Sequence, residues 1–252
     1  MERAIHFRQA VSLLGRFPAL AGVDLDVAAG EILLLQGSNG AGKTTLLRTC
    51  AGLLPVVSGD AQVLGHDLRT DRRSLRHRVG LLAHATGLYD DLTVRDNIRF
   101  WSRAVRARSV DADAAMERLG LAGRLASVPV ARLSAGQRRR TALACLVARR
   151  PEVWLLDEPH AGLDAPGRDL IDGIVRDAAA AGATVLVASH ELERAGNLAD
   201  RRVVISGGMI VSDGPAGSGP AVLRGDVASI VPDRDLRVAD RSTEPLAVIH
   251  AR

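Results

Sequence analysis

A run of nine residues carries the side chains best suited to binding a phosphate group. It reads Gly37-Ser38-Asn39-Gly40-Ala41-Gly42-Lys43-Thr44-Thr45 and contains the full spacing G-x-x-x-x-G-K-T. Glycines let successive backbone N–H groups converge on one anion, and a lysine and a threonine at these positions reach the outer phosphates of a nucleotide and its Mg²⁺. The run therefore predicts a nucleotide-binding loop rather than an ordinary glycine-rich turn.

The use of basic residues in the chain supports this interpretation. Lys43 is the only lysine among 33 lysine and arginine residues. A compact ammonium on a flexible stem suits a phosphate group enclosed by backbone, whereas a planar guanidinium does not. The sole lysine therefore stands at a position where a compact point charge suits a phosphate group.

A second group of reactive side chains follows two apolar runs. Val153–Leu156 leads into Asp157 and Glu158, and Thr184–Ala188 leads into Ser189 and His190. Because ligand sites of open α/β sheets lie beyond the carboxyl ends of the strands, we expect these groups to meet there. One carboxylate suits Mg²⁺ and the other suits a general base. The alternatives are a strand-end salt bridge for Glu158 and a structural role for the histidine.

The elements that must position these groups have readable patterns. Glu31–Leu35 is an apolar run typical of a buried strand, and Lys43–Ala51 is helical in pattern and ends before Gly52. Residues 1–36 alternate short β-like runs with turns, which predicts a β-rich leading layer. Phe17 lies in this layer upstream of the phosphate loop, where it is a candidate to stack on adenine or, equally, a turn residue.

The middle of the chain reads as helices. Thr93 with Asp96, and Ser134 with Gln137, have the spacing of a capping box, and the second pair begins an amphipathic run to about Arg149. Residues 111–119 read as another helix, so residues 88–150 are expected to form a helical insertion in an α/β domain.

The remaining segments complete the α/β pattern. Residues 69–78 are expected to form a solvated helix face, 79–83 a strand, 166–181 a helix, and 203–211 a hairpin. The ordered domain is expected to cover residues 1–212. Residues 213–252 begin with a linker-like sequence rich in glycine and proline and predict a poorly specified tail.

Composition limits the classes of protein that fit. The chain has 252 residues, 47% of them hydrophobic, and a net charge of +4 whose arginines are dispersed, so we expect a folded core and no nucleic-acid surface. No apolar run approaches the roughly 20 residues of a membrane span, and no signal pattern precedes the domain. We therefore expect a cytoplasmic protein, with Cys50 and Cys145 as packed, reduced thiols.

Five short motifs occur in a characteristic order. They are the phosphate loop and the segments 133–137, 155–159, 161–164 and 189–190, which read LSAGQ, LLDEP, AGLD and SH. With this order and spacing the chain resembles the nucleotide-binding subunit of an ABC transporter over about residues 3–212. The resemblance implies an α/β fold of the P-loop NTPase (ABC ATPase) class, with an N-terminal antiparallel β layer and an inserted helical subdomain.

The resemblance also implies roles for individual residues. Thr44 and Asp157 would hold Mg²⁺, Glu158 would act as general base on the water that attacks ATP, and His190 would contact the γ-phosphate.

Further residues are implied to act between two subunits. Ser134, Gly136 and Gln137 would close the ATP site of a second copy, or of a related ATPase, in a head-to-tail dimer, and Asp164 would lie at the dimer seam. Ala135 replaces the commoner glycine of this motif, a small change at a helix N-terminus.

A narrower resemblance rests on residues 81–93. Here His84 stands where most ABC subunits carry glutamine, which looks like the ATPase of the cytochrome c maturation haem exporter, although Ala85 departs from the His-Gln pair often found there. His84 is therefore a candidate to sense the bound γ-phosphate or its water and Mg²⁺. The amide role of the usual glutamine does not transfer directly to an imidazole.

These features predict the ATP-hydrolysing subunit of a membrane exporter, held on the cytoplasmic face of the membrane by an integral-membrane permease. The expected cargo of the exporter is haem, with a drug or lipid as the alternative, since the membrane subunits choose the cargo. A non-transport ABC ATPase is the other alternative, but the interval from Gly42 to Ser134 leaves no room for the long coiled coil of chromosome-maintenance relatives. A GTPase would need a second lysine in its N-K-x-D motif, and an ATP-binding scaffold without turnover would not need Glu158.

Overall fold

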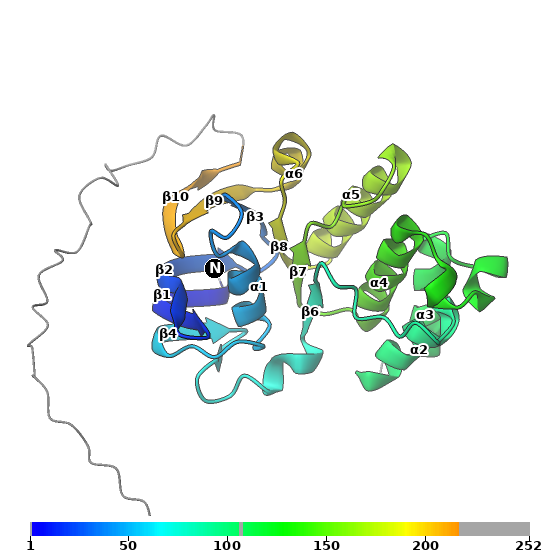
Figure 1. The fold of residues 1–252 in the computed structure, drawn as a ribbon, viewed down its shortest axis with the longest axis horizontal. Coiled ribbons are helices and arrows are strands. Elements are labelled where there is room, and N and C mark those ends of the chain that lie inside the picture. Colours follow the sequence, from blue (N-terminus) through cyan, green and yellow to red (C-terminus); the bar gives the residue numbers. More distant parts are fainter. Residues whose placement is uncertain (1, 106–107, 217–252) are drawn as a thin grey trace, which may run out of the picture. The chain divides into compact units, whose positions relative to one another are not determined.

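A computed structural model describes residues 2–105 and 108–216 of the chain. Within these residues two β-sheets lie toward one side, and helices α2, α3 and α4 gather on the other (Figure 1). The α/β fold with an antiparallel N-terminal layer and an inserted group of helices, as predicted from the sequence, is confirmed.

The N-terminal layer is an antiparallel sheet with the strand order β2-β1-β4-β5. Its strands are β1 (Arg3–Leu14), β2 (Phe17–Ala28), β4 (Ser58–Val63) and β5 (His66–Asp67). In β1 the side chains alternate, with Ile5 and Phe7 buried and His6 and Arg8 partly exposed. This alternation is expected of a sheet that packs with one face only.

The second sheet has the strand order β10-β9-β3-β8-β7-β6, and only the β9–β10 hairpin is antiparallel. Its strands are β3 (Ile32–Gln36), β6 (Val79–Leu82), β7 (Val153–Asp157), β8 (Thr184–Ala188), β9 (Arg201–Ser206) and β10 (Met209–Pro215). Every residue of β7 and β8 is buried. Parallel strands covered on both faces read as continuous apolar runs, which is why the sequence predicts them.

Each face of the parallel sheet has its own hydrophobic core. One core joins Leu33, Leu155 and Leu186 of the sheet to helix α1 (Lys43–Cys50) and to the antiparallel sheet. The other joins Leu156 and Val187 to the remaining helices, which are α2 (Val94–Ala104), α3 (Ser109–Arg118), α4 (Ala135–Arg149), α5 (Ala165–Ala180) and α6 (Leu192–Leu198). Each fully buried leucine contributes about 2 kcal/mol to these cores.

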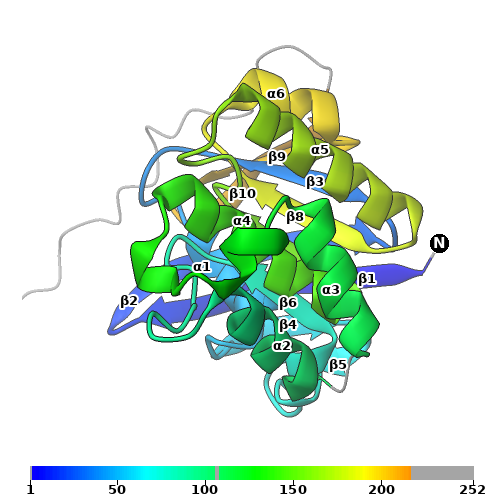
Figure 2. The same cartoon turned by 90° about the vertical axis from the view of Figure 1, so that its right-hand side faces the viewer.

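The inserted helices begin at the predicted caps. Thr93 accepts a hydrogen bond from the backbone of Asp96 at the start of α2. At α4, Ser134 and Gln137 each accept from the backbone N–H of the other, which completes a capping box. Helices α2, α3 and α4 pack on one another in the view of Figure 2. Among the described helices, none has the length and apolar character of a membrane span.

The two cysteines are free and buried, one in α1 and one in α4. Burial raises the pKa of both the Cys50 and the Cys145 thiol to about 12. They therefore remain protonated and packed at neutral pH.

Two expectations differ from the structure. Residues 69–78 form turns and a short 3-10 helix, Ser74–His77, instead of a helix face. The backbone N–H of Arg69 and the hydroxyl of Ser74 donate to nearby aspartates, and such local bonds compete with helix formation. The last strand also extends through Pro215, past the boundary placed at 212, and the rest of the predicted tail, from 217, lies outside the described residues.

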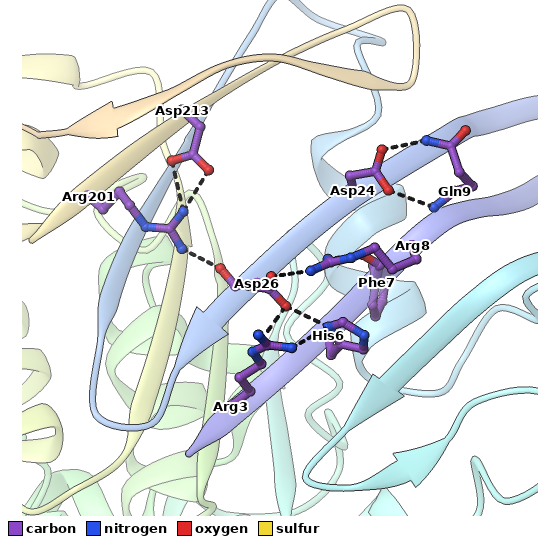
Figure 3. Close-up of polar contacts among 9 residues, drawn as sticks. All are labelled: Arg3, His6, Phe7, Arg8, Gln9, Asp24, Asp26, Arg201 and Asp213. Carbon is purple, nitrogen blue, oxygen red and sulfur yellow. Dashed lines mark hydrogen bonds and ion pairs between the residues drawn. The ribbon is translucent and has the colours of Figure 1, made fainter. Parts of the chain in front are cut away.

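A network of charged side chains ties the two sheets together (Figure 3). Arg201 of β9 donates to both carboxylate oxygens of Asp213 on β10 and to the backbone carbonyl of Asp26 on β2. The carboxylate of Asp26 accepts from His6 and Arg8 on β1 at 2.6 and 2.5 Å. Asp213 therefore fastens the end of β10, which explains the longer hairpin.

The Asp26 carboxylate makes the stability of this layer sensitive to pH. Burial opposes ionisation, but hydrogen bonds from Arg8 and His6 outweigh it and hold the pKa of Asp26 below its ordinary value. A depressed pKa stabilises the folded state above the ordinary value of about 3.9, and this contribution is lost as the pH falls through the folded value.

We expect Asp26→Asn to lower the free energy of unfolding at pH 7 by about 0.5–1 kcal/mol, a figure reduced for the partial exposure of the pair. The difference from the unsubstituted protein should persist at pH 5 and shrink as the pH falls below the ordinary value of about 3.9 and the native aspartate protonates. Urea denaturation at pH 7 and at acidic pH measures it. Asp91→Asn, in an exposed turn, is the control and should have no effect. A difference independent of pH would contradict the ionic explanation.

Candidate functional site

Parallel pairing brings the predicted reactive groups to one edge of the second sheet. Ala188 of β8 lies beside Leu35 of β3 on one side and Asp157 of β7 on the other, and Leu82 of β6 pairs with Leu156. The loops that follow these four strands therefore leave the sheet side by side. This is the edge at which ligands bind in open α/β sheets.

The loop that follows β3 fits tightly against its surroundings. Gly37 has φ of 149°, and a Cβ there would lie 2.3 Å from the carbonyl oxygen of Ile205. Gly42 has φ of 117°, and its Cβ would lie 2.9 Å from the oxygen of Ala19. These two positions need glycine for both conformation and space. The loop can then present its backbone N–H groups to an anion at the start of α1.

Lys43 and Thr44 begin α1 directly after this loop. The Lys43 side chain is 8% exposed, and its ammonium donates to the carbonyl oxygens of Gly37 at 2.7 Å and Ser38 at 3.0 Å. The Thr44 hydroxyl donates to Asp157 Oδ2 at 2.9 Å, which joins α1 to the end of β7. Two oxygen ligands of the type that Mg²⁺ prefers thus lie together beside the loop.

Glu158 and His190 contact each other on the neighbouring loops. The Glu158 carboxylate accepts from the backbone N–H of His190 at 3.2 Å and lies 3.4 Å from its Nε2. The Glu158 side chain is 26% exposed and that of His190 is 55% exposed. The pair is held near Asp157 and can still reach a ligand at the sheet edge.

The segment from Ser134 to Gln137 lies beside the segment from Ala161 to Asp164. A Cβ on Gly136 would stand 3.0 Å from the oxygen of Gly162. Asp164 caps α5 by accepting from the backbone of Gly167. In the described residues, no hydrogen bond links Ser134, Gly136 or Gln137 to the phosphate loop. Within one chain the predicted site residues therefore form two clusters. One surrounds the phosphate loop, and the other consists of segments 134–137 and 161–164.

Phe17 and His84 are both exposed. Phe17 begins β2 and is 79% exposed, and the carbonyl oxygen of Ala19, two residues later, lies where a Cβ on Gly42 would meet it. His84 follows β6 in an exposed bend, next to Ala83. Both positions are compatible with the predicted roles at the nucleotide and leave those roles as predictions.

Two buried polar groups close to this edge were not predicted from the sequence. Arg139 of α4 is 5% exposed and donates to four backbone carbonyls, one just after β6 and three at and after the end of β7. His160 is 1% exposed, and its Nε2 lies 2.7 Å from Asp172 on α5. Within the residues described, His160 Nδ1 has no hydrogen-bond partner. The signal for Arg139 was present, because it falls on the apolar face of α4, four residues before the buried Leu143.

Comparisons with known proteins identify related chains. The family model for the ABC transporter domain matches residues 20–161. The daunorubicin resistance ATP-binding protein DrrA3 of Streptomyces coeruleorubidus is 39% identical over 235 residues, which are 91% of this chain and 74% of the relative. The cytochrome c biogenesis ATP-binding export protein CcmA of Bradyrhizobium diazoefficiens is 37% identical, over 73% of this chain and 90% of the relative. The CcmA of Roseobacter denitrificans is 43% identical, over 70% and 79%.

Solved structures share the fold. The dimeric ATP-binding cassette MJ0796 bound to ADP and Pi superposes with a TM-score of 0.78 and 21% identity, covering 85% of this chain and all of that one. CbiO1 of Clostridium perfringens, part of the ABC transporter complex cbiONQ, gives a TM-score of 0.73 and 25% identity, covering 86% and 90%.

The buried ammonium of Lys43 predicts a strong effect of a charge-conserving change. Lys43→Arg should weaken nucleotide binding by at least about tenfold, because a planar guanidinium cannot occupy the space between two loop carbonyls. Isothermal calorimetry with ATP measures it. The reverse exchange Arg48→Lys, on the exposed side of the same helix, is the control and should leave affinity unchanged. Equal affinity in both variants would contradict the role assigned to the sole lysine.

Proposed function

This chain belongs to the ABC transporter family, and on that premise we propose that the groups gathered at the sheet edge form the ATP-hydrolysing centre of a membrane exporter. The chain is the ATP-binding, ATP-hydrolysing subunit of such a transporter. One observation carries the assignment of the centre. Thr44, next to the loop-bound Lys43, donates to Asp157, and Glu158 accepts from His190. Direct contacts thus connect three separate parts of the sequence at this edge.

The phosphate loop is the proposed binding site of the ATP phosphates. Its backbone N–H groups and the Lys43 ammonium would bind the phosphate oxygens, with Ser38, Asn39, Gly40, Ala41 and Thr45 completing the loop and the first turn of the helix. Phe17 would stack on the adenine ring at the exposed start of β2.

Magnesium fits the donor set beside the loop. The hydroxyl of Thr44 and the carboxylate of Asp157 lie 2.9 Å apart and are both oxygen ligands. When bound, Mg²⁺ would neutralise charge on the phosphates. Asp157 also orients the Thr44 hydroxyl through their hydrogen bond, so the two ligands support each other.

Glu158 is the proposed general base. It would orient a water in line with the γ-phosphate and take up its proton, while His190, in contact with the same carboxylate, would bind the γ-phosphate. His84, on the next loop along the sheet edge, would sense the bound phosphate and transmit closure to the membrane partner.

The proposed working unit contains a second cassette and an integral-membrane permease on the cytoplasmic face of the cell membrane. Ser134, Gly136 and Gln137 would complete the ATP site of the other subunit, because these residues make no hydrogen bond to their own loop among the residues described. Asp164 would lie at the seam between the two copies. The helix N-terminus at Ser134 has the polarity that suits a phosphate.

The proposed cargo is haem for cytochrome c biogenesis. Similarity to CcmA over most of the cassette and the presence of His84 support this choice. A drug-like cargo is the second candidate, because the similarity to DrrA3 extends over 91% of the chain.

Glu158→Gln should leave ATP affinity within about threefold and reduce hydrolysis by at least about a hundredfold, the scale of losing a general base. A phosphate-release assay with calorimetry separates the two effects. His84→Gln is the comparison and should keep hydrolysis within about tenfold, since an amide also hydrogen-bonds at that position. Hydrolysis by Glu158→Gln near the unsubstituted rate would remove Glu158 from the base role.

Deletion of the gene should separate the two cargos. Loss of haem-bearing c-type cytochromes, measured by haem staining of membrane proteins, is the outcome expected from haem export. The phosphate-loop variant Lys43→Arg should fail to restore them, whereas Arg48→Lys should succeed. Normal cytochromes together with new sensitivity to daunorubicin would favour the drug exporter instead.

A further inference from the structure

Arg139 lies where three separate segments of the chain meet. Its Nη1 donates to the carbonyl oxygen of Ala83 at 2.7 Å, beyond the end of β6. Its Nη2 donates to the carbonyl oxygens of Asp157 and Glu158, both at 2.5 Å, and its Nε donates to Pro159 at 3.3 Å. One side chain on α4 thus holds the backbone that follows both β6 and β7.

This guanidinium is buried without a carboxylate bonded to it in the described part of the chain. Burial lowers the pKa of Arg139, and the charges of Asp157 and Glu158 oppose that change. An arginine still remains protonated at neutral pH. A buried cation whose hydrogen bonds go to backbone carbonyls fixes geometry, because moving any of those carbonyls leaves a charged donor unsatisfied.

The backbone of Glu158 needs such support. Its φ is 50°, in the left-handed region that costs a residue with a Cβ about 1 kcal/mol or more. Its N–H donates to the carbonyl of Ala188 at 2.8 Å, while its own carbonyl accepts from Arg139. The two bonds hold the peptide groups on both sides of the strained residue, and its side chain is thereby aimed at His190.

We propose that Arg139 is a positioning residue for hydrolysis, which fixes the backbone of Glu158 and couples it to the segment carrying His84 and to helix α4. This inference rests on the proposed role of Glu158 as general base. Helix α4 begins at the capped Ser134, so a shift of this helix would move the guanidinium and change the direction of the Glu158 carboxylate. Binding of a ligand to Ser134 would therefore change the direction of the Glu158 carboxylate in the same chain.

Two substitutions test the role of the planar guanidinium of Arg139. Arg139→Gln keeps a donor but can serve at most two of the four carbonyls, and Arg139→Lys keeps the charge without the planar guanidinium. We expect kcat to fall about tenfold to a hundredfold in Arg139→Gln and by less in Arg139→Lys, with KM and the ATP dissociation constant within about threefold of the original. A purely structural role would instead weaken ATP binding together with kcat.

Arg149→Met is the matched control. Arg149 is also an arginine of α4, partly buried, and it donates to the carbonyls of Arg76 and Val79 at the opposite end of the helix. It should cost thermal stability as Arg139→Gln does, while kcat stays within about twofold. A similar loss of kcat in both variants would overturn the proposal.

A double substitution separates the proposal from the function on which it rests. Under single-turnover conditions, Arg139→Gln should cause no further loss in a Glu158→Gln background, because the group it positions is already absent. Independent, multiplicative losses would overturn the positioning role. If Glu158→Gln alone keeps its activity, the base assignment fails. If Glu158→Gln is inactive and Arg139→Gln is fully active, only the inference about Arg139 fails.

Discussion

The structure depends on the parallel, in-register pairing of β3, β8 and β7 in the second sheet. Because Leu35, Ala188 and Asp157 lie level across these strands, the chain leaves the sheet at three adjacent points. Each exit carries a different chemical group: a loop of backbone donors, an imidazole, and a pair of carboxylates. A slip of one residue in any strand would turn its side chains to the opposite face and separate these groups.

At this edge, residues with strained backbone conformations lie close to the hydrophobic cores that hold the strands in place. Gly37 and Gly42 fit only because they lack a side chain, and Glu158 adopts a left-handed conformation although it has one. The cores on both faces of the sheet hold the strands on which these residues lie, so the loops can be forced into unfavourable geometry. The packing of leucine and valine side chains in the two cores thus helps to fix the orientation of the Glu158 carboxylate.

Short-range patterns allowed much of this arrangement to be predicted. Continuous apolar runs indicated the buried strands, and the capping pairs at Thr93 and Ser134 located helix starts correctly. Contacts over long sequence separations were not accessible: nothing near residue 139 in the sequence identifies Ala83 as its partner, and nothing near His160 indicates Asp172. The prediction for segment 69–78 was wrong because polar side chains favour turns when they bind nearby backbone, as Asp67 binds the N–H of Arg69.

The two separate cores have a consequence for how the molecule opens locally. The helices α2, α3 and α4 bury their apolar side chains against one face of the sheet, whereas the phosphate loop and the antiparallel sheet are supported from the other. Local unfolding of the helical group would expose side chains of the first core, whereas the second core contains no side chain of α2, α3 or α4. Arg139 is a polar link between the helical group and the carboxyl end of β7.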